Sequence, residues 1–163
     1  MAVRAVLAKI EDLAKRQSGL PILGAKKGAL LAETVRMHKP KHILEVGTLI
    51  GYSAILMAAE LAPGARITCV EVSADNAAKA HANFAEAGVA DKIEIVIGPG
   101  LKVIPTLKGP HDFLFIDAHK EEYLGYLKAA EPKLAKRAVV VADNVGRFKD
   151  DVGEVRAGTE CGI

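Results

Sequence analysis

Hydrophobic residues change their spacing along this chain in a regular order, and that order predicts its elements. Apolar residues recur at helical spacing from Val3 to Ala14, and a second helical pattern begins near Gly24 and is stopped by Pro40. Beyond Pro40, short runs rich in β-branched residues alternate with further helical patterns. These runs predict strands over residues 42–47, 66–71, 92–97, 111–117 and 137–143.

Strands that alternate with helices predict an α/β fold: a doubly wound parallel sheet of about five strands, with helices on both faces. Two N-terminal helices precede this sheet. The length of 163 residues fits one domain. We divide it into N-terminal helices over 1–40, a core that contains the sheet over 41–145 and a tail over 146–163. In such sheets, ligands bind beyond the carboxyl ends of the strands.

Composition narrows the class of partner. Hydrophobic residues make up 50% of the chain but aromatic residues only 4%, so aliphatic side chains must fill the core. The 22 basic and 20 acidic residues nearly cancel, which leaves no general field to attract nucleic acid. No apolar run approaches the roughly 20 residues of a membrane span, and two cysteines form no disulfide framework. We therefore expect a cytoplasmic protein that binds a small molecule, and neither nucleic acid nor a membrane.

A glycine turn follows the first predicted strand, between Glu45 and Ser53. Gly47 and Gly51 stand where a strand must stop and a helix must begin, and glycine lets a ligand approach the backbone closely. The free N–H groups of that helix favour an anionic or strongly polar group. The spacing lacks the middle glycine of the dinucleotide-binding fingerprint. It therefore favours an adenosine ligand other than NAD.

An acidic residue, Glu71, ends the second predicted strand, 24 positions beyond Gly47. In doubly wound sheets, an acidic residue about 20 positions past the glycine turn accepts hydrogen bonds from ribose hydroxyls. Alternatively, Glu71 caps or solvates the next helix. Together with the glycine turn, Glu71 favours a ribose site, and Gly98 after the third strand lies at the same rim.

Three oxygen-bearing residues end the fourth and fifth predicted strands: Asp117, Asp143 and Asn144. Carboxylate and amide oxygens suit Mg²⁺ or another hard divalent ion. Taken singly, Asp117 could be an ordinary helix cap, and the Asp143-Asn144 pair an ordinary turn. Their joint placement on two strands of one sheet favours the metal site.

Lys120 lies three residues past Asp117, in the first turn of a predicted helix, where a cation opposes the helix dipole. This placement indicates a use, because a partly desolvated lysine near a metal can take a proton from a hydroxyl. The alternative is a solvated lysine. His119 is a secondary candidate for the same role. The basic clusters at 26–27 and 39–42 are interpreted as solvated faces, because no aromatic residues that could stack bases lie among them.

Three segments together resemble the cation-dependent O-methyltransferases, the catechol and caffeoyl-CoA type, within the Rossmann-like class that depends on S-adenosylmethionine (SAM). The first segment is Leu44-Glu45-Val46-Gly47-Thr48 with Gly51-Tyr52-Ser53. The second is Phe115-Ile116-Asp117-Ala118-His119-Lys120 with Tyr123, and the third is Val141-Ala142-Asp143-Asn144-Val145. The resemblance covers residues from about 30 to 145.

The resemblance implies a role for each matching position. The methionine half of SAM would be lined by Glu45, Gly47, Thr48, Gly51, Tyr52 and Ser53. Glu71 would hold the ribose and Gly98 would border the adenine. Asp117, Asp143 and Asn144 would bind Mg²⁺, with Asp117 also next to the cofactor. Lys120 would be the general base in methyl transfer to a metal-bound hydroxyl of a small catechol-like or phenolic acceptor.

The chain also departs from the family pattern. Family members commonly continue with two more strands, whereas only residues 146–163 follow here. The fifth strand would then be a bare sheet edge, which proteins cover or pair, so we expect a homodimer or a chain shortened from a longer protein. Pro99-Gly100 and Gly146 also replace residues that often contact adenine and substrate.

Three other functions stay open at this point. Methylation of a hydroxylated RNA base would need a basic surface around the rim of the sheet. A cofactor-binding module without turnover would fit the shortened C-terminal region, although Lys120 and the three oxygen ligands argue against it. A dehydrogenase is disfavoured by the glycine spacing.

Overall fold

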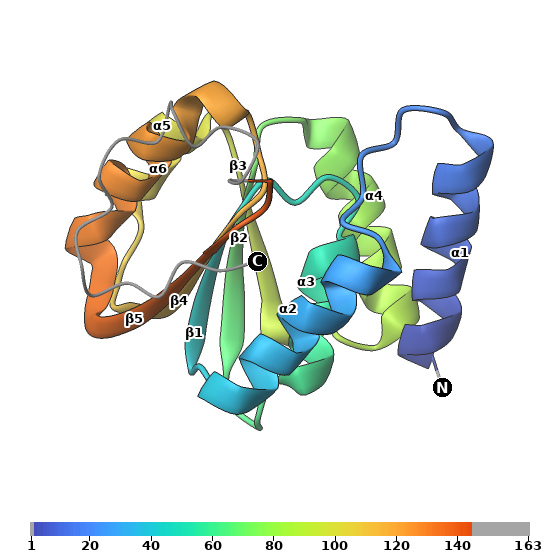
Figure 1. Cartoon of the computed structure of the whole chain (residues 1–163), viewed down its shortest axis with the longest axis horizontal. Coiled ribbons are helices and arrows are strands. Elements are labelled where there is room, and N and C mark those ends of the chain that lie inside the picture. Colours follow the sequence, from blue (N-terminus) through green and yellow to red (C-terminus); the bar gives the residue numbers. More distant parts are fainter. Residues whose placement is uncertain (1, 145–163) are drawn as a thin grey trace.

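Five parallel strands form one sheet, in the order β3-β2-β1-β4-β5 (Figure 1). They are β1 (His42–Val46), β2 (Arg66–Glu71), β3 (Ile93–Ile97), β4 (His111–Ile116) and β5 (Leu134–Ala142). This computed structural model describes residues 2–144, so the predicted tail, with Gly146, lies outside the described residues. The predicted doubly wound sheet of five strands is confirmed.

Helices cover both faces of the sheet (Figure 1). The layer on one face comprises α1 (Ala2–Arg16), α2 (Ala25–His38), α3 (Tyr52–Glu60) and α4 (Ala74–Ala87). The other face carries α5 (Gly100–Val103) and α6 (Tyr123–Ala130). The two predicted N-terminal helices are therefore present as α1 and α2.

Alternate residues of each strand supply two separate cores, because successive side chains of a strand point to opposite faces. Ile43 and Phe113 pack on the side of α1 to α4, whereas Leu44 and Leu114 pack on the side of α5 and α6. All four side chains are wholly buried. Burial on both faces explains why the strands appear in the sequence as continuous apolar runs.

Local signals set most of the element boundaries. The hydroxyl of Ser73 accepts a hydrogen bond from the Asn76 N–H at 3.3 Å and caps α4, which ends at Gly88 with φ +72°. One strand boundary differs from the prediction by more than one residue: β5 begins at Leu134 instead of 137. In the sequence, the two charged residues Lys136 and Arg137 are typical of a loop. Their side chains are exposed, and an edge strand can carry such charges.

Strands β1 and β4 are neighbours in the sheet, at the point where the strand order reverses. Doubly wound sheets open a crevice at this switch point. The Gly47 N–H donates to the carbonyl of Val70 at 3.0 Å, and the Asp117 N–H donates to the carbonyl of Val46 at 2.9 Å. Gly47 has φ +91°, and a Cβ there would lie 2.1 Å from the Asp117 carbonyl oxygen. Only glycine fits at this position.

The switch point predicts a difference between two glycines. Gly47→Ala and Gly88→Ala both place alanine at positive φ, which costs about 1–2 kcal/mol, but nothing lies within 4 Å of a Cβ at Gly88. We expect Gly47→Ala to lower the free energy of unfolding by about 2 kcal/mol more than Gly88→Ala. Urea unfolding of the two variants measures the difference, and equal losses would contradict the close approach at Gly47.

Two histidines lie at the opposite, amino-terminal ends of the strands. The rings of His42 and His111 have centroids 4.0 Å apart, and Nε2 of His42 is 2.9 Å from the hydroxyl of Thr68. His111 is wholly buried, and neither ring nitrogen has a hydrogen-bond partner among residues 2–144. Burial, with a smaller contribution from His42, lowers the pKa of His111 to about 4.

Because His111 is buried, we expect the folded protein to lose stability in acid. In the unfolded chain His111 has its ordinary pKa of 6.5 and in the folded chain a pKa of about 4, so stability falls as pH decreases through that window. The loss is about 3 kcal/mol. We expect His111→Phe to remove most of it and His81→Phe, at an exposed position, to leave it. Urea unfolding at pH 7, 5 and 4 measures this loss for each variant. If His111→Phe loses as much unfolding free energy between pH 7 and 4 as His81→Phe, the expectation is wrong.

Candidate functional site

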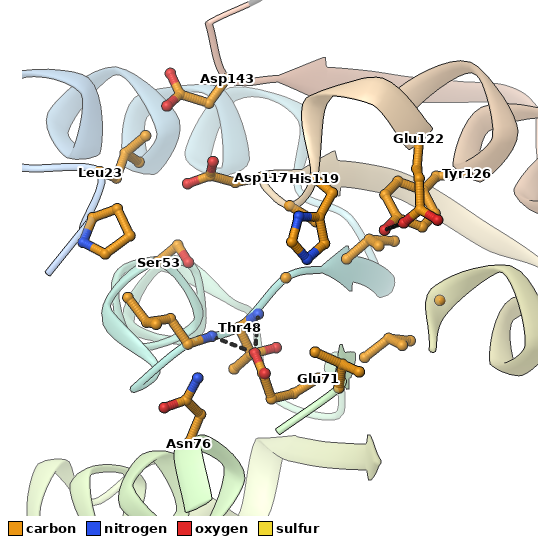
Figure 2. Close-up of a pocket in the computed structure, with 18 of the residues that line it drawn as sticks. Leu23, Thr48, Ser53, Glu71, Asn76, Asp117, His119, Glu122, Tyr126 and Asp143 are labelled. Carbon is orange, nitrogen blue, oxygen red and sulfur yellow. Dashed lines mark hydrogen bonds between the residues drawn. The ribbon is translucent and has the colours of Figure 1, made fainter. Parts of the chain in front are cut away.

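A pocket of about 700 Å³ opens at the carboxyl ends of the strands, at the switch point (Figure 2). Pockets of this size hold small ligands. The predicted site residues on its wall are Gly47, Thr48, Tyr52, Ser53, Glu71, Gly98, Asp117, Lys120, Asp143 and Asn144. The glycine turn and the group of acidic and amide residues therefore share one cavity.

Glu71 holds the glycine turn in place. One carboxylate oxygen accepts hydrogen bonds from the N–H groups of Thr48 at 3.2 Å and Leu49 at 2.7 Å (Figure 2). The other oxygen accepts from the N–H of Ser73 at 2.9 Å. A carboxylate has about four lone-pair sites, so Glu71 has acceptor capacity left towards the pocket. Both interpretations of Glu71, helix-end acceptor and ligand acceptor, are compatible with this geometry.

Glu45 and Gly51 lie behind the pocket wall. Glu45 is wholly buried on the face of β1 that meets α3, where its carboxyl accepts from the hydroxyl of Ser53 at 2.5 Å and from Sγ of Cys69 at 3.1 Å. Burial raises its pKa to about 7. A Cβ on Gly51 would lie 2.4 Å from the ring of Phe84. Glu45 therefore positions Ser53, and Gly51 lets α4 pack against the turn.

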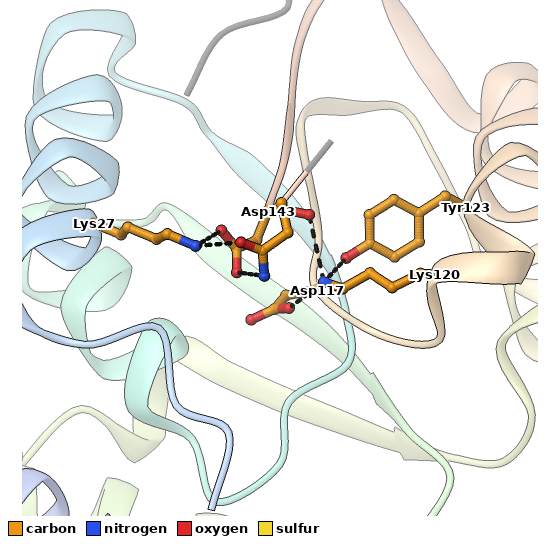
Figure 3. Close-up of polar contacts among 6 residues, drawn as sticks. Lys27, Asp117, Lys120, Tyr123 and Asp143 are labelled. Atoms are coloured by element: carbon orange, nitrogen blue, oxygen red, sulfur yellow. Dashed lines mark hydrogen bonds and ion pairs between the residues drawn. The ribbon is translucent and has the colours of Figure 1, made fainter. Parts of the chain in front are cut away.

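Asp117 and Asp143 lie at the ends of β4 and β5, together with Lys27, which was not predicted (Figure 3). Asn144 directly follows Asp143. Nζ of Lys27, on α2, lies 2.5 Å from Oδ1 of Asp143 and 2.6 Å from Oδ1 of Asn144. The side-chain amide of Asn144 donates to Oδ2 of Asp143 at 2.9 Å. The prediction of a solvated face at 26–27 is therefore wrong for Lys27.

Lys120 approaches the same group from the opposite side (Figure 3). Its Nζ donates to the hydroxyl of Tyr123 at 2.8 Å, lies 3.5 Å from Oδ1 of Asp117 and 3.4 Å from the carbonyl oxygen of Asp143. These three oxygens fix the amine at the pocket wall. His119, the secondary candidate, also lines the pocket from this loop but is exposed.

Asp117, Asp143 and Asn144, which we call the acidic group, form an environment that favours a cation. Burial raises the pKa of Asp117, the nearby Asp143 raises it further, and Lys120 lowers it. Two carboxylates and an amide oxygen are hard donors that fit Mg²⁺, and the ammonium of Lys27 already occupies two of them. Over the described part of the chain, no three His, Cys, Asp or Glu side chains form a metal cluster. The donor set thus suits a hard cation that keeps positions open for other ligands.

Several wall residues were not predicted from the sequence. They include Leu23, from a loop, and Asn76, Glu122 and Tyr126, from helices (Figure 2). For Lys27, too, no local signal was available: the structure shows that a Cβ on Gly28 would lie 2.6 Å from the side chain of Leu56, so α2 approaches α3 closely and brings Lys27 to the rim.

Thr48 carries a polar atom whose hydrogen bonding is incomplete. Its hydroxyl is buried at the pocket wall and has no hydrogen-bond partner within residues 2–144. Buried polar atoms are normally satisfied by protein, water or ligand. Because Thr48 acts to lower the pKa of Glu45, its hydroxyl lies towards that carboxyl, behind the pocket wall.

None of the helices that the structure describes has the length and apolar character needed to cross a membrane.

Comparison with known proteins agrees with this architecture. The sequence profile of a family described as O-methyltransferase matches residues 4–159. A catechol O-methyltransferase from Mycobacterium tuberculosis is 39% identical over 126 residues, which cover 77% of this chain and 57% of that protein. A catechol O-methyltransferase from Bos taurus is 34% identical over 149 residues, which cover 87% of this chain and 55% of that protein.

Solved structures resemble the whole described fold. The O-methyltransferase TomG from Streptomyces achromogenes, in complex with SAM, has a TM-score of 0.81 and 34% identity, covering 94% of this chain and 72% of that one. An O-methyltransferase from Bacillus cereus, in complex with SAH, has a TM-score of 0.81 and 28% identity with the same coverage. The chain spans about half the length of the two catechol O-methyltransferases. The profile and the relatives together show that this chain belongs to the O-methyltransferase family.

Proposed function

We propose that the chain carries out SAM-dependent methylation of a hydroxyl group on a small catechol-like or phenolic molecule. The observation that carries this proposal is the single pocket in which the glycine turn and Glu71 face Asp117, Lys120, Asp143 and Asn144. Support comes from the neighbours described as bound to SAM or SAH and from the relatives described as catechol O-methyltransferases.

The proposed donor site is the half of the pocket next to β1, β2 and β3. Glu71 keeps the turn after β1 closed through the N–H groups of Thr48 and Leu49, and its one remaining acceptor site is proposed to receive a ribose hydroxyl. Ser53, whose hydroxyl donates to Glu45, would lie next to the methionine carboxylate. Gly98 would border the adenine.

The proposed cation site consists of Asp117, Asp143 and Asn144. Their hard oxygens fit Mg²⁺, which when bound polarises a hydroxyl and favours its deprotonation. Support comes from the raised pKa of Asp117 and from the ammonium that these oxygens already attract.

Lys120 is the proposed general base. Tyr123 and the carbonyl of Asp143 hold its Nζ at the wall, where the amine would take the proton of the acceptor hydroxyl. The acceptor oxygen then bonds to the methyl carbon as the bond from carbon to sulfur breaks, which leaves S-adenosylhomocysteine. The pocket walls hold the reacting atoms together, which lowers the entropic part of the barrier.

A homodimer in the cytoplasm is part of the proposal. Among the described strands, β5 pairs with β4 alone, and an open edge is normally covered or paired. Cys69 is a buried free thiol, as expected in a reducing compartment. We expect no nucleic-acid partner, because the chain has a net charge of only +2.

The donor site predicts how S-adenosylhomocysteine binds. Glu71→Ala removes the acceptor for two N–H groups of the turn together with the proposed ribose contact, so affinity should fall about tenfold or more. Glu94→Ala, at an exposed position on the neighbouring β3, makes the same change in charge and should bind like the wild type. Calorimetry measures both. A wild-type chain that binds no S-adenosylhomocysteine would overturn the proposed activity.

If Lys120 is the base, its loss should slow methylation without weakening the binding of S-adenosylhomocysteine. Lys120→Met should lower the rate of catechol methylation with Mg²⁺ by about 10²–10⁴ while S-adenosylhomocysteine affinity stays within about twofold. Lys128→Met, at an exposed position on α6, should leave both unchanged. Single-turnover assays measure the rates. If Lys120→Met keeps the wild-type rate, Lys120 is not the base; if wild type and both variants bind but none turns over, the chain is a binding module.

A further inference from the structure

Among residues 2–144, Lys27 contacts the acidic group but belongs neither to the sequence motifs nor to the proposed reaction. It reaches the group from α2, while Lys120 reaches it from the other side (Figure 3). The side chain of Asp143 is only 10% exposed and that of Lys27 40% exposed. Lys27 therefore extends from the surface of α2 into the pocket.

The position of Lys27 on its helix is unfavourable by itself. It lies in the first turn of α2, where the free N–H groups make a cation costly, and that turn contains no acidic residue. Its neighbour Lys26, in the same turn, is exposed. Something must offset this arrangement at Lys27, and the oxygens of Asp143 and Asn144 at 2.5 and 2.6 Å do so.

The formal charges around the proposed cation site cancel. Asp117 and Asp143 carry two negative charges, and Lys27 and Lys120 carry two positive ones, so the group is neutral without any ion. The oxygens that Lys27 contacts belong to two of the three residues of the proposed cation site. A divalent ion on the same oxygens would stand beside the ammonium, and two cations at that distance repel each other strongly.

We infer that Lys27 is a built-in substitute for the divalent ion: its ammonium occupies Asp143 and Asn144 when the ion is absent and leaves when the ion binds. This inference rests on the proposed function, because it concerns the same cation site. Without the ion, Lys27 keeps the oxygens of Asp143 and Asn144 aligned and holds α2 against the end of β5. The departing ammonium frees the first turn of α2, which follows Leu23 on the pocket rim.

Manganese binding tests the inference. Free Mn²⁺ is measured by electron paramagnetic resonance during titration of the full chain with saturating S-adenosylhomocysteine. If the ammonium occupies the oxygens for nine-tenths of the time, the apparent dissociation constant is raised about tenfold. Lys27→Met should therefore bind Mn²⁺ about tenfold more tightly than the wild type. Lys26→Met, with the same change in charge in the same helical turn, should stay within about twofold of it.

The outcomes separate the two claims. If the wild type binds Mn²⁺ and Lys27→Met binds it equally or less tightly, Lys27 does not compete and only this inference fails. If no variant binds Mn²⁺ at millimolar concentration, the proposed cation site fails together with it. Without metal, Lys27→Met should also unfold at a lower temperature than Lys26→Met, because two oxygens lose their cation.

A second measurement avoids variants that fail to fold. Reductive methylation of the wild type, followed by mass spectrometry of its peptides, reports how accessible each lysine amine is. The Lys27 amine should react slowly without Mg²⁺ and several-fold faster with it, while Lys26 reacts equally in both. Equal reactivity of Lys27 under both conditions, with ion binding shown by calorimetry, would overturn the inference.

Discussion

The close approach of Gly47 to the carbonyl of Asp117 is the constraint on which the site depends. It exists because β1 and β4 are neighbours whose chains continue to opposite faces of the sheet. A Cβ at Gly47 would separate the turn after β1 from the loop after β4. Without that contact, the turn held by Glu71 and the acidic group around Asp117 would be two surfaces instead of one pocket.

The two faces of the sheet supply opposite walls of that pocket. Helices α2 and α3, on one face, carry Lys27 and Ser53, whereas the segment between β4 and α6, on the other face, carries Lys120. No helix within residues 2–144 contributes to both walls. The parallel register of the strands therefore sets the distance between the walls, and the buried aliphatic cores on each side keep it fixed.

The sequence predicted the sheet, the helices and most of the rim, because strand ends and glycine turns are local signals. It could not tell which face of the strand Glu45 would take relative to the ligand, and the structure places it under α3. It also missed Lys27, which lies 116 positions before Asp143. That contact depends on how α2 packs on α3 and on the sheet, and no local pattern of residues specifies this.

The paired rings of His42 and His111 stand at the far ends of the same strands whose other ends form the pocket. Five residues of β1 separate the two ends, a span of about 15 Å at roughly 3.3 Å per residue. Energetic coupling between substitutions fades beyond about 7–10 Å. The effects of substitutions in the pocket and at the histidine pair should therefore be additive. Substrate preference and acid tolerance could then change independently during evolution.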